Sequence, residues 1–548
     1  MRNLMLFMLG LLLVVPAAVR AQDGAAQAEV EAPKEAVGPT GQIPKDSPIC
    51  VRVKSLDRVD VIAKELIPIL KAFGAVKEAA MLEAAPASAL VFMQAGMDAA
   101  SVDKTKPLFM GMTKSEKPVF LFHPAAAWEG DRPLRDGFVA RLKDGVGVAG
   151  PKTALDGATR GVPTRTLDGD AVVHVYLGDL VEANKEDIEN QFAQAAMQVA
   201  GNAGLPETVR AVVPHVLSGL KEAAFSVESF DYALTWKAGS VEAEGLLRTK
   251  PRTALRALLQ RAGKPGDASD LVGYLPKDSI MTYDGVVTPD WPLKEMGAMI
   301  QKAVGEDAGA AIVQLLGTML PFSQQLTGRQ ASAVGMAGMM NLSVTSLAEL
   351  KEGVDPKTVF AKYDVAGINA ALKKFEVPLT YTLEKAVAKH GEVELHRVSM
   401  ASEHPMLGAA LAMSQTYLAA DNGHLFMVVS ATAEDDIKIL IDQVRKGAKI
   451  EHPHSKIMAT LGREHNMGLS FNLSALKPLA MMAGMFGVPP ELTQAIQNLP
   501  DNMMLATSIT IADGDIHWRG NWPVKEIAKI AEAMTPGAGG ADNDEDFD

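Results

Sequence analysis

The sequence predicts an α+β protein built from two tandem related domains, an internal duplication, in which antiparallel β-sheets have helices packed on one face. Three observations predict it: short motifs recur in the same order in both halves, apolar and polar residues alternate around glycine turns, and helical periodicity lies between these hairpins. A length of 548 residues allows two to four domains, and 48% hydrophobic residues suit a globular core.

The first 21 residues have the three parts of a secretory signal peptide. Arg2 supplies the positive charge, residues 4–15 are almost uninterruptedly apolar, and Val19-Arg20-Ala21 offers a cleavage site before Gln22. The apolar run is shorter than the ~20 residues that a membrane-spanning helix needs. We therefore expect export to the periplasm or the extracellular space, with an uncleaved anchor as the alternative. After cleavage, no integral membrane protein is expected.

Both ends of the mature chain are expected to lack packed structure. Residues 22–45, rich in Ala, Glu, Gly and Pro, predict a flexible leader. Residues 536–548 combine a glycine-rich spacer with five acidic residues, which is typical of a disordered acidic tail. Asp542, Asp544 and Asp546 have the spacing that opens a calcium loop, but the glycine and the closing glutamate of such a loop are missing.

The first recurring motif opens both halves. Ile43-Pro44-Lys45-Asp46-Ser47 returns as Leu275-Pro276-Lys277-Asp278-Ser279, 232 residues later, and each copy precedes a β-rich run and a helical segment. In the first copy, apolar residues at helical spacing from Val59 to Phe73 predict the helix. Asp57 is its expected N-cap, and Pro68 predicts a kink or a break.

Three more matches follow in the same order. The hairpin Leu234–Gly239 aligns with Ile509–Gly514, Gly245 then falls on Gly520, and Pro251 or Pro523 is expected to begin the next helix. The strand Val172–Tyr176 after Leu167-Asp168-Gly169 resembles Leu425–Val429 after Asp421-Asn422-Gly423, with helices near Glu186 and Asp435. Gly204–Glu207 resembles Gly487–Glu491. These matches predict repeat domains 46–263 and 275–533; the alternative is unrelated hairpins with similar glycine turns.

Composition and motifs exclude several classes of protein. A pI near 5.4 argues against nucleic-acid binding, and a single cysteine excludes intramolecular disulfides and cysteine-based metal sites. Gly145–Gly150 matches the dinucleotide-binding pattern, but a helical stretch containing Phe138 and Leu142 is predicted before it and Pro151 follows. A flexible loop is predicted there instead, and no cofactor is expected.

One group of histidines has the side chains that a metal site needs. His452-Pro453-His454, with Glu464 and His465, is the densest group, and its side chains would suit zinc. The spacing matches no recognised zinc pattern, and Pro453 places the pair in a loop or at a helix start. No metal site is therefore predicted, and His390 and His396 are interpreted as solvated positions.

Sulfur chemistry offers the last candidates. Cys50 lies in an apolar β-rich run, which predicts a buried, inert thiol. Methionine is the compositional excess, and its clusters are interpreted as core packing; the alternatives are an adaptable apolar pocket or a Cu(I) site. The clusters are Met110 with Met112, Met336 with Met339 and Met340, and Met481 with Met482 and Met485.

No residue presents itself as a catalytic one, because no nucleophile elbow, P-loop or S-x-x-K with its partner motifs is present. The export signal, the repeat and this lack of motifs favour a non-enzymatic binding or structural protein of the bacterial envelope. Its partner would be a protein or an apolar small molecule in a groove between sheet and helices. The alternatives are an envelope hydrolase with its active site at the repeat junction, and a carrier of apolar ligands.

Overall fold

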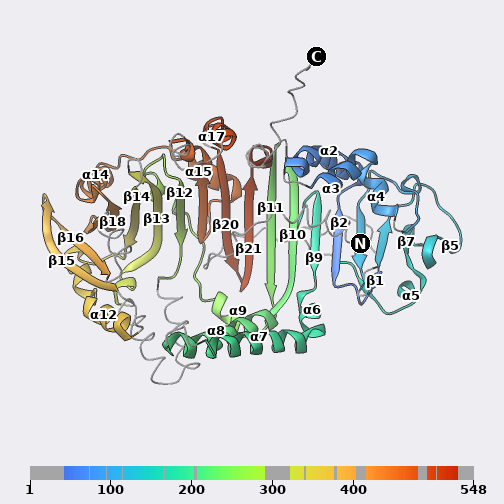
Figure 1. Ribbon diagram of the computed structural model, residues 1–548, viewed down its shortest axis with the longest axis horizontal. Coiled ribbons are helices and arrows are strands. Elements are labelled where there is room, and N and C mark those ends of the chain that lie inside the picture. Colours follow the sequence, from blue (N-terminus) through green and yellow to red (C-terminus); the bar gives the residue numbers. More distant parts are fainter. Residues whose placement is uncertain are drawn as a thin grey trace, which may run out of the picture.

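A wide antiparallel sheet of nineteen strands dominates the computed structural model (Figure 1). The described residues are 42–72, 75–93, 95–113, 115, 117–163, 167–202, 207–237, 239–289, 321–337, 341–374, 379–402, 415–478, 480, 490–501 and 503–528. The expected signal peptide, residues 22–41 of the leader and the acidic tail lie outside them. The prediction of a mixed α+β protein with antiparallel pairing is confirmed.

The N-terminal half contributes nine strands, which pair in the order β5-β6-β7-β4-β3-β2-β9-β10-β11. Their bounds are β2 (Ile49–Val53), β3 (Leu108–Met112), β4 (Pro118–Phe122), β5 (Arg132–Pro133), β6 (Phe138–Lys143), β7 (Val146–Pro151), β9 (Ala171–Val175), β10 (Val227–Lys237) and β11 (Ser240–Thr249).

The C-terminal half pairs in the order β15-β16-β17-β18-β14-β13-β12-β19-β20-β21. The two halves meet where β11 pairs with β21. The bounds are β12 (Met281–Val286), β13 (Leu326–Ala337), β14 (Asn341–Leu350), β15 (Leu379–His390), β16 (Val393–Ser402), β17 (Gln415–Asp421), β18 (His424–Ser430), β19 (Met467–Asn472), β20 (Met504–Ala512) and β21 (Asp515–Trp522).

The strand order is the same around the first strand of each half. β2 lies between β3 and β9, and β12 lies between β13 and β19; in each half the last two strands complete the run toward the central β11–β21 pair. The last hairpins also share a register: Tyr232 pairs with Gly245 and, 275 residues later, Thr507 pairs with Gly520.

The third sequence match is wrong. It equated β9 with β18, but β9 lies between β2 and β10, whereas β18 lies between β14 and β17. The strand that takes the place of β9 is β19. A glycine turn followed by an apolar strand is common to many hairpins, so this local resemblance did not specify a position in the sheet.

Helices pack on both faces of the sheet, so the prediction of helices on one face does not hold. Helix α2 (Leu56–Ala72) packs its Leu66 and Ile69 in one core with Trp236 and Val241. Val241 pairs with Trp522, the neighbour of Asn521, and Asn521 pairs with Ala506. Because adjacent strand residues point to opposite faces, α15 (Pro453–Leu461), which packs against Ala506, lies on the other side.

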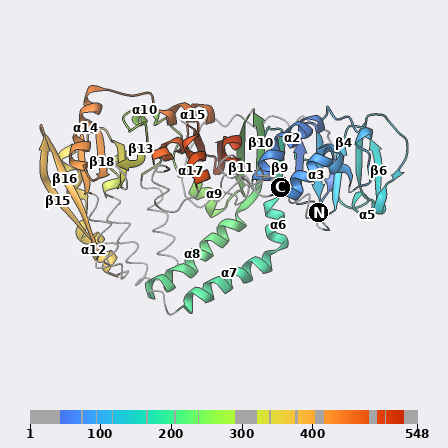
Figure 2. The ribbon, with the colours of Figure 1, turned by 45° about the horizontal axis from the view of Figure 1, so that its top comes forward.

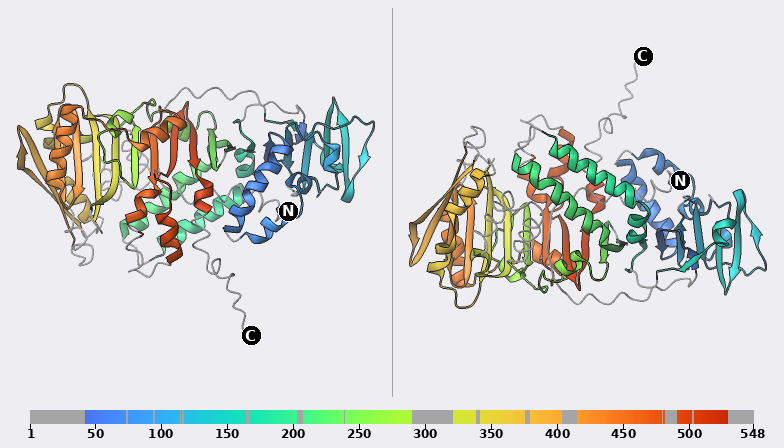
Figure 3. Two further views of the ribbon diagram at one scale, coloured as in Figure 1. Left: turned by 90° about the horizontal axis from the view of Figure 1, so that it is seen from above. Right: turned by 90° about the horizontal axis from the view of Figure 1, so that it is seen from below.

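The remaining helices surround the sheet, and α7 packs alongside α8 in a pair that stands off from it (Figures 2 and 3). Within the described residues, no helix combines the length and apolarity needed to cross a bilayer. Their bounds are α3 (Val76–Ala84), α4 (Ala87–Met93), α5 (Lys152–Leu155), α6 (Leu177–Ala183), α7 (Lys185–Ala200), α8 (Glu207–Phe225), α9 (Ala254–Leu259), α10 (Ser269–Val272), α12 (Val365–Lys374), α14 (Ala433–Lys446) and α17 (Pro490–Gln497).

Several local predictions also differ from the structure. The end of the expected leader forms β1 (Gln42–Pro44), paired with β8 (Thr159–Gly161), because Ile43 is fully buried there. The cap of α2 is Ser55, whose hydroxyl accepts the Arg58 N–H at 3.1 Å, and Asp57 lies in the first turn. The helix continues past Pro68.

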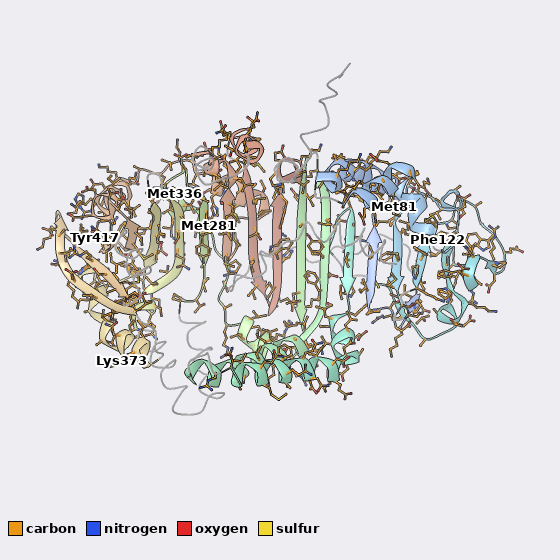
Figure 4. The ribbon with its side chains drawn as sticks, viewed as in Figure 1. Met81, Phe122, Met281, Met336, Lys373 and Tyr417 are labelled. Atoms are coloured by element: carbon orange, nitrogen blue, oxygen red, sulfur yellow. The ribbon has the colours of Figure 1, made fainter. Side chains whose placement is uncertain are left out.

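The stretch that was expected to be a helix and a glycine-rich loop is the hairpin β6–β7. Phe138 and Ala140 alternate with more exposed residues, which is the period of a strand. Gly147 is required because an added Cβ would lie 2.5 Å from Cε2 of Phe122, a core residue labelled in Figure 4. These glycines therefore permit close packing in a sheet.

Candidate functional site

The densest histidine group of the sequence does converge on one carboxylate. Pro453 begins α15, as expected, and His452 caps it by accepting the His454 N–H on Nδ1 at 3.2 Å. His454 and His465 both place Nε2 2.8 Å from Oδ1 of Asp284 on β12. Glu464, the carboxylate that the sequence suggested, is exposed.

A serine completes this group. Nδ1 of His454 lies 2.6 Å from the hydroxyl oxygen of Ser470 on β19, so His454 joins a serine on one ring nitrogen to an aspartate on the other. A hydrolase triad contains the same three residue types, but there the serine bonds to Nε2 and the aspartate to Nδ1, so the two ring nitrogens are exchanged here. Neither Ser470 nor Asp284 was a candidate in the sequence, because single polar residues within strands have no local signature.

The protonation of this group follows from its contacts. Burial by itself raises the pKa of Asp284, but the hydrogen bonds from His454 and His465 outweigh it and lower that pKa to about 2. Burial likewise acts to lower the pKa of His465, and the bond to Asp284 reverses this, so that the pKa of His465 is raised. The contacts therefore favour the charged forms of both Asp284 and His465.

Complete burial prevents this group from acting as an open active site. Asp284, His454 and Ser470 have 0% exposure and His465 has 1%. Gly468 belongs to the same packing, since an added Cβ would lie 2.6 Å from Nε2 of His465. Among the described residues, no set of three or more His, Cys, Asp or Glu has the arrangement to hold a metal ion.

The N-terminal half buries a comparable polar group on the same face of the sheet. His174 on β9 and Arg248 on β11 both bond to the carboxylate of Asp231 on β10, which is fully buried. At the seam between the halves, Glu244 accepts from Arg519 at 2.9 Å, and Nε2 of His517 lies 2.7 Å from the same carboxylate oxygen. We call this side of the sheet the polar face.

The opposite side of the central strands has the reverse character. On β19 the polar-face residues Gly468, Ser470 and Asn472 are buried, whereas Met467 and Leu469 are partly exposed and Phe471 is 38% exposed. On β20, Ala506, Ser508 and Thr510 are buried while Leu505, Thr507 and Ile509 are partly exposed. The apolar residues of a strand are normally its buried ones, so the distribution on β19 and β20 is inverted.

We call this opposite side, from β9 across the central strands to β18, the neutral face. The strand pairings place no charged side chain on it among the described residues of these strands. Its partly exposed apolar residues include Val173, Phe230, Leu247, Trp518, Ile509, Met467, Leu469, Met281, Tyr283, Val334, Met336, Val344 and Met427, of which Met281 and Met336 are labelled in Figure 4.

A cavity of about 590 Å³ lies at the N-terminal side, lined by residues of α5, α6 and the segment after β1. Its charged groups are already paired in part: Arg160 binds Asp179 at 2.6 Å and lies 3.6 Å from the ring centre of Tyr176. This cavity therefore offers fewer free groups than its size suggests.

Several of the other sequence candidates that the structure describes lie in the core or make side-chain contacts. Cys50 is buried, as expected, and burial raises its pKa to about 12. Met110 lies in the core beneath α4, whereas Met339, Met340 and the cluster from Met481 to Met485 lie outside the described residues. His390 contacts Asp442 at 2.8 Å; His396 was expected to be solvated but is buried and accepts the Ala386 N–H.

Comparison with protein-family models, curated proteins and solved structures finds no match to this chain.

Proposed function

We propose that this chain is an exported, non-enzymatic binding protein of the bacterial envelope that holds an apolar ligand on its neutral face. The observation that supports this most is the inverted distribution on β19 and β20. Met467, Leu469 and Ile509 are partly exposed, whereas Ser470 and Ser508 are buried. This arrangement costs free energy unless the apolar surface binds a ligand. Partly exposed, contiguous apolar side chains are typical of ligand sites.

The proposal includes an origin by duplication. Equal strand order around β2 and β12, and the equal register of the last hairpins, support it. The 275-residue offset also relates Glu244 to Arg519, and these two residues pair with each other across the seam. Such self-pairing is expected when two copies meet about a twofold axis.

Export is proposed from the features of residues 1–21 alone. The test is the N-terminus of the mature protein isolated from cells. Cleavage after Ala21 would leave Gln22 as the first residue; recovery of Met1 or Arg2 in the mature chain would contradict signal-peptide removal.

An envelope hydrolase is the alternative, which the contacts of Ser470, His454 and Asp284 favour. A fluorophosphonate reagent labels activated serines and separates the two proposals. Because Ser470 is fully buried, we expect no labelling of the native protein. Stoichiometric labelling that is lost in Ser470→Ala would support the hydrolase.

The binding function is tested by native mass spectrometry of the protein purified from its host envelope without detergent. We expect a bound species of lower mass that is extracted by organic solvent. A chain that carries no ligand, and that also fails to take up 1-heptadecanol added as a neutral apolar probe, would contradict the proposal.

A further inference from the structure

Four aromatic rings form a continuous row on the neutral face near the seam between the halves. The ring centres of Phe230 and Tyr232 are 6.2 Å apart, those of Tyr232 and Trp518 are 6.0 Å apart, and both pairs are stacked, with interplanar angles of 23° and 15°. Trp518 then meets Trp522 edge-on at 6.4 Å. Phe230 and Trp518 are partly exposed, so part of this row faces outward.

Two glycines allow the rings to lie across the strands. An added Cβ at Gly245 would lie 3.2 Å from Cε3 of Trp518, and one at Gly520 would lie 2.5 Å from Nε1 of Trp522. Gly245 and Gly520 occupy the same place in the two final hairpins. Because neither glycine has a side chain, the aromatic rings can lie flat across the strands. We call these four rings the aromatic platform.

We propose that this platform binds a flat, neutral, multi-ring ligand by stacking on Trp518. The proposal rests on the proposed function and specifies its ligand class. The described strand residues of the neutral face offer no charged side chain to a ligand, and Glu65 of α2, the carboxylate beside Trp236, already accepts its indole N–H. A flexible chain would gain apolar contact but no stacking, whereas a flat ring system gains both.

The test compares two probes with the same carbon number and one hydroxyl each, 1-pyrenemethanol and 1-heptadecanol, by fluorescence titration and by competition. We expect 1-pyrenemethanol to bind more tightly. Trp518→Leu should weaken its binding about tenfold, equivalent to ~1.4 kcal/mol, and Trp518→Phe should largely restore it. Trp128→Leu is the matched control, since Trp128 stacks on Phe122 in the core beneath α4, far from β21 in the strand order.

A second variant keeps the test independent of tryptophan removal. Gly245→Ala adds one methyl group against Trp518, so it should weaken binding of 1-pyrenemethanol and leave binding of 1-heptadecanol unchanged. Circular dichroism and thermal unfolding establish that each variant is folded. Equal loss of both probes in these variants, or tight binding of 1-heptadecanol alone, would overturn the ring proposal while the binding function stands. Failure of both probes would overturn both.

Discussion

Asp284 is expected to contribute strongly to the pH dependence of stability at acidic pH. Its carboxyl has a pKa of about 2 when folded, against 3.8 ordinarily, so the folded chain binds fewer protons there than the unfolded chain. The resulting contribution, about 2 kcal/mol, is present above about pH 4 and is lost as the pH falls toward 2. His465 acts in the opposite sense: its raised pKa contributes stability below about pH 6.5 that is lost as the pH rises.

Asp284→Asn should therefore flatten the acid limb of the stability profile. Urea unfolding from pH 2 to 8 measures this, and at neutral pH the variant should lose about 3–5 kcal/mol, the usual cost of breaking a buried ion pair. Asp442→Asn is the control, because Asp442 also contacts a histidine but is 43% exposed. An unchanged acid limb in Asp284→Asn would show that this carboxylate is not the responsible group.

At this scale the sequence was partly informative. Pro453 predicted a loop or a helix start; a helix begins there, and that helix delivers His454 to the sheet. Nothing local could identify Asp284 or Ser470 as partners of His454, because Asp284 lies 170 residues from it in the chain and strand pairing alone brings them together.

Among the elements, the seam between β11 and β21 joins the two halves. Arg519 donates to Glu244 at 2.9 Å, and both side chains are about one-third exposed. We expect Glu244→Gln and Arg519→Gln each to destabilise the protein modestly. Because Nε2 of His517 also lies 2.7 Å from the Glu244 carboxylate, the first should cost more.

The double variant should show a coupling of about 1 kcal/mol between the two sites, measured from urea unfolding. The pair Lys71→Gln and Glu83→Gln, an exposed ion pair outside the sheet, should show a smaller coupling. If the seam pair couples no more than this control, the ion pair does not contribute to joining the halves.

Glycine turns correctly predicted the position of the last hairpin, but they did not predict which strands pair with each other. The glycine turn at Gly514, with φ of +84°, marked the last hairpin correctly. The glycine turn before Leu425 was matched with the turn before β9, which was wrong. A glycine turn predicts a hairpin but does not predict which strands lie beside that hairpin. In β6 the apolar spacing of Phe138 and Leu142 fits a helix, whereas pairing with β7 makes it a strand.

At the scale of the whole molecule, contacts between the two halves are made by strands and by helices of the described residues. β11 pairs with β21, α2 packs with Trp522 and Val524, and α9 packs with Ile511 and Ile516. These contacts should hold the halves together without a covalent link. The sequence could not predict how the halves meet, since side-by-side joining through two last strands has no local sequence signal.

A protease site inserted after Lys264, an exposed residue between α9 and α10, tests this. After cleavage, both fragments should co-elute from a size-exclusion column at the volume of the intact chain, and the thermal unfolding midpoint should fall only modestly. Separate elution of the fragments in native buffer would contradict a seam that stabilises the assembly.

The use of the neutral face is tested most directly by the dissociation constant of 1-heptadecanol for Ile509→Glu and Ile439→Glu. Both changes put a carboxylate in place of isoleucine, but Ile509 lies on the neutral face between Met467 and Trp518, whereas Ile439 is 56% exposed on α14. We predict that folded Ile509→Glu binds at least tenfold more weakly than the unaltered protein, and that Ile439→Glu binds equally well. Equal binding by all three proteins would contradict a ligand site on this face.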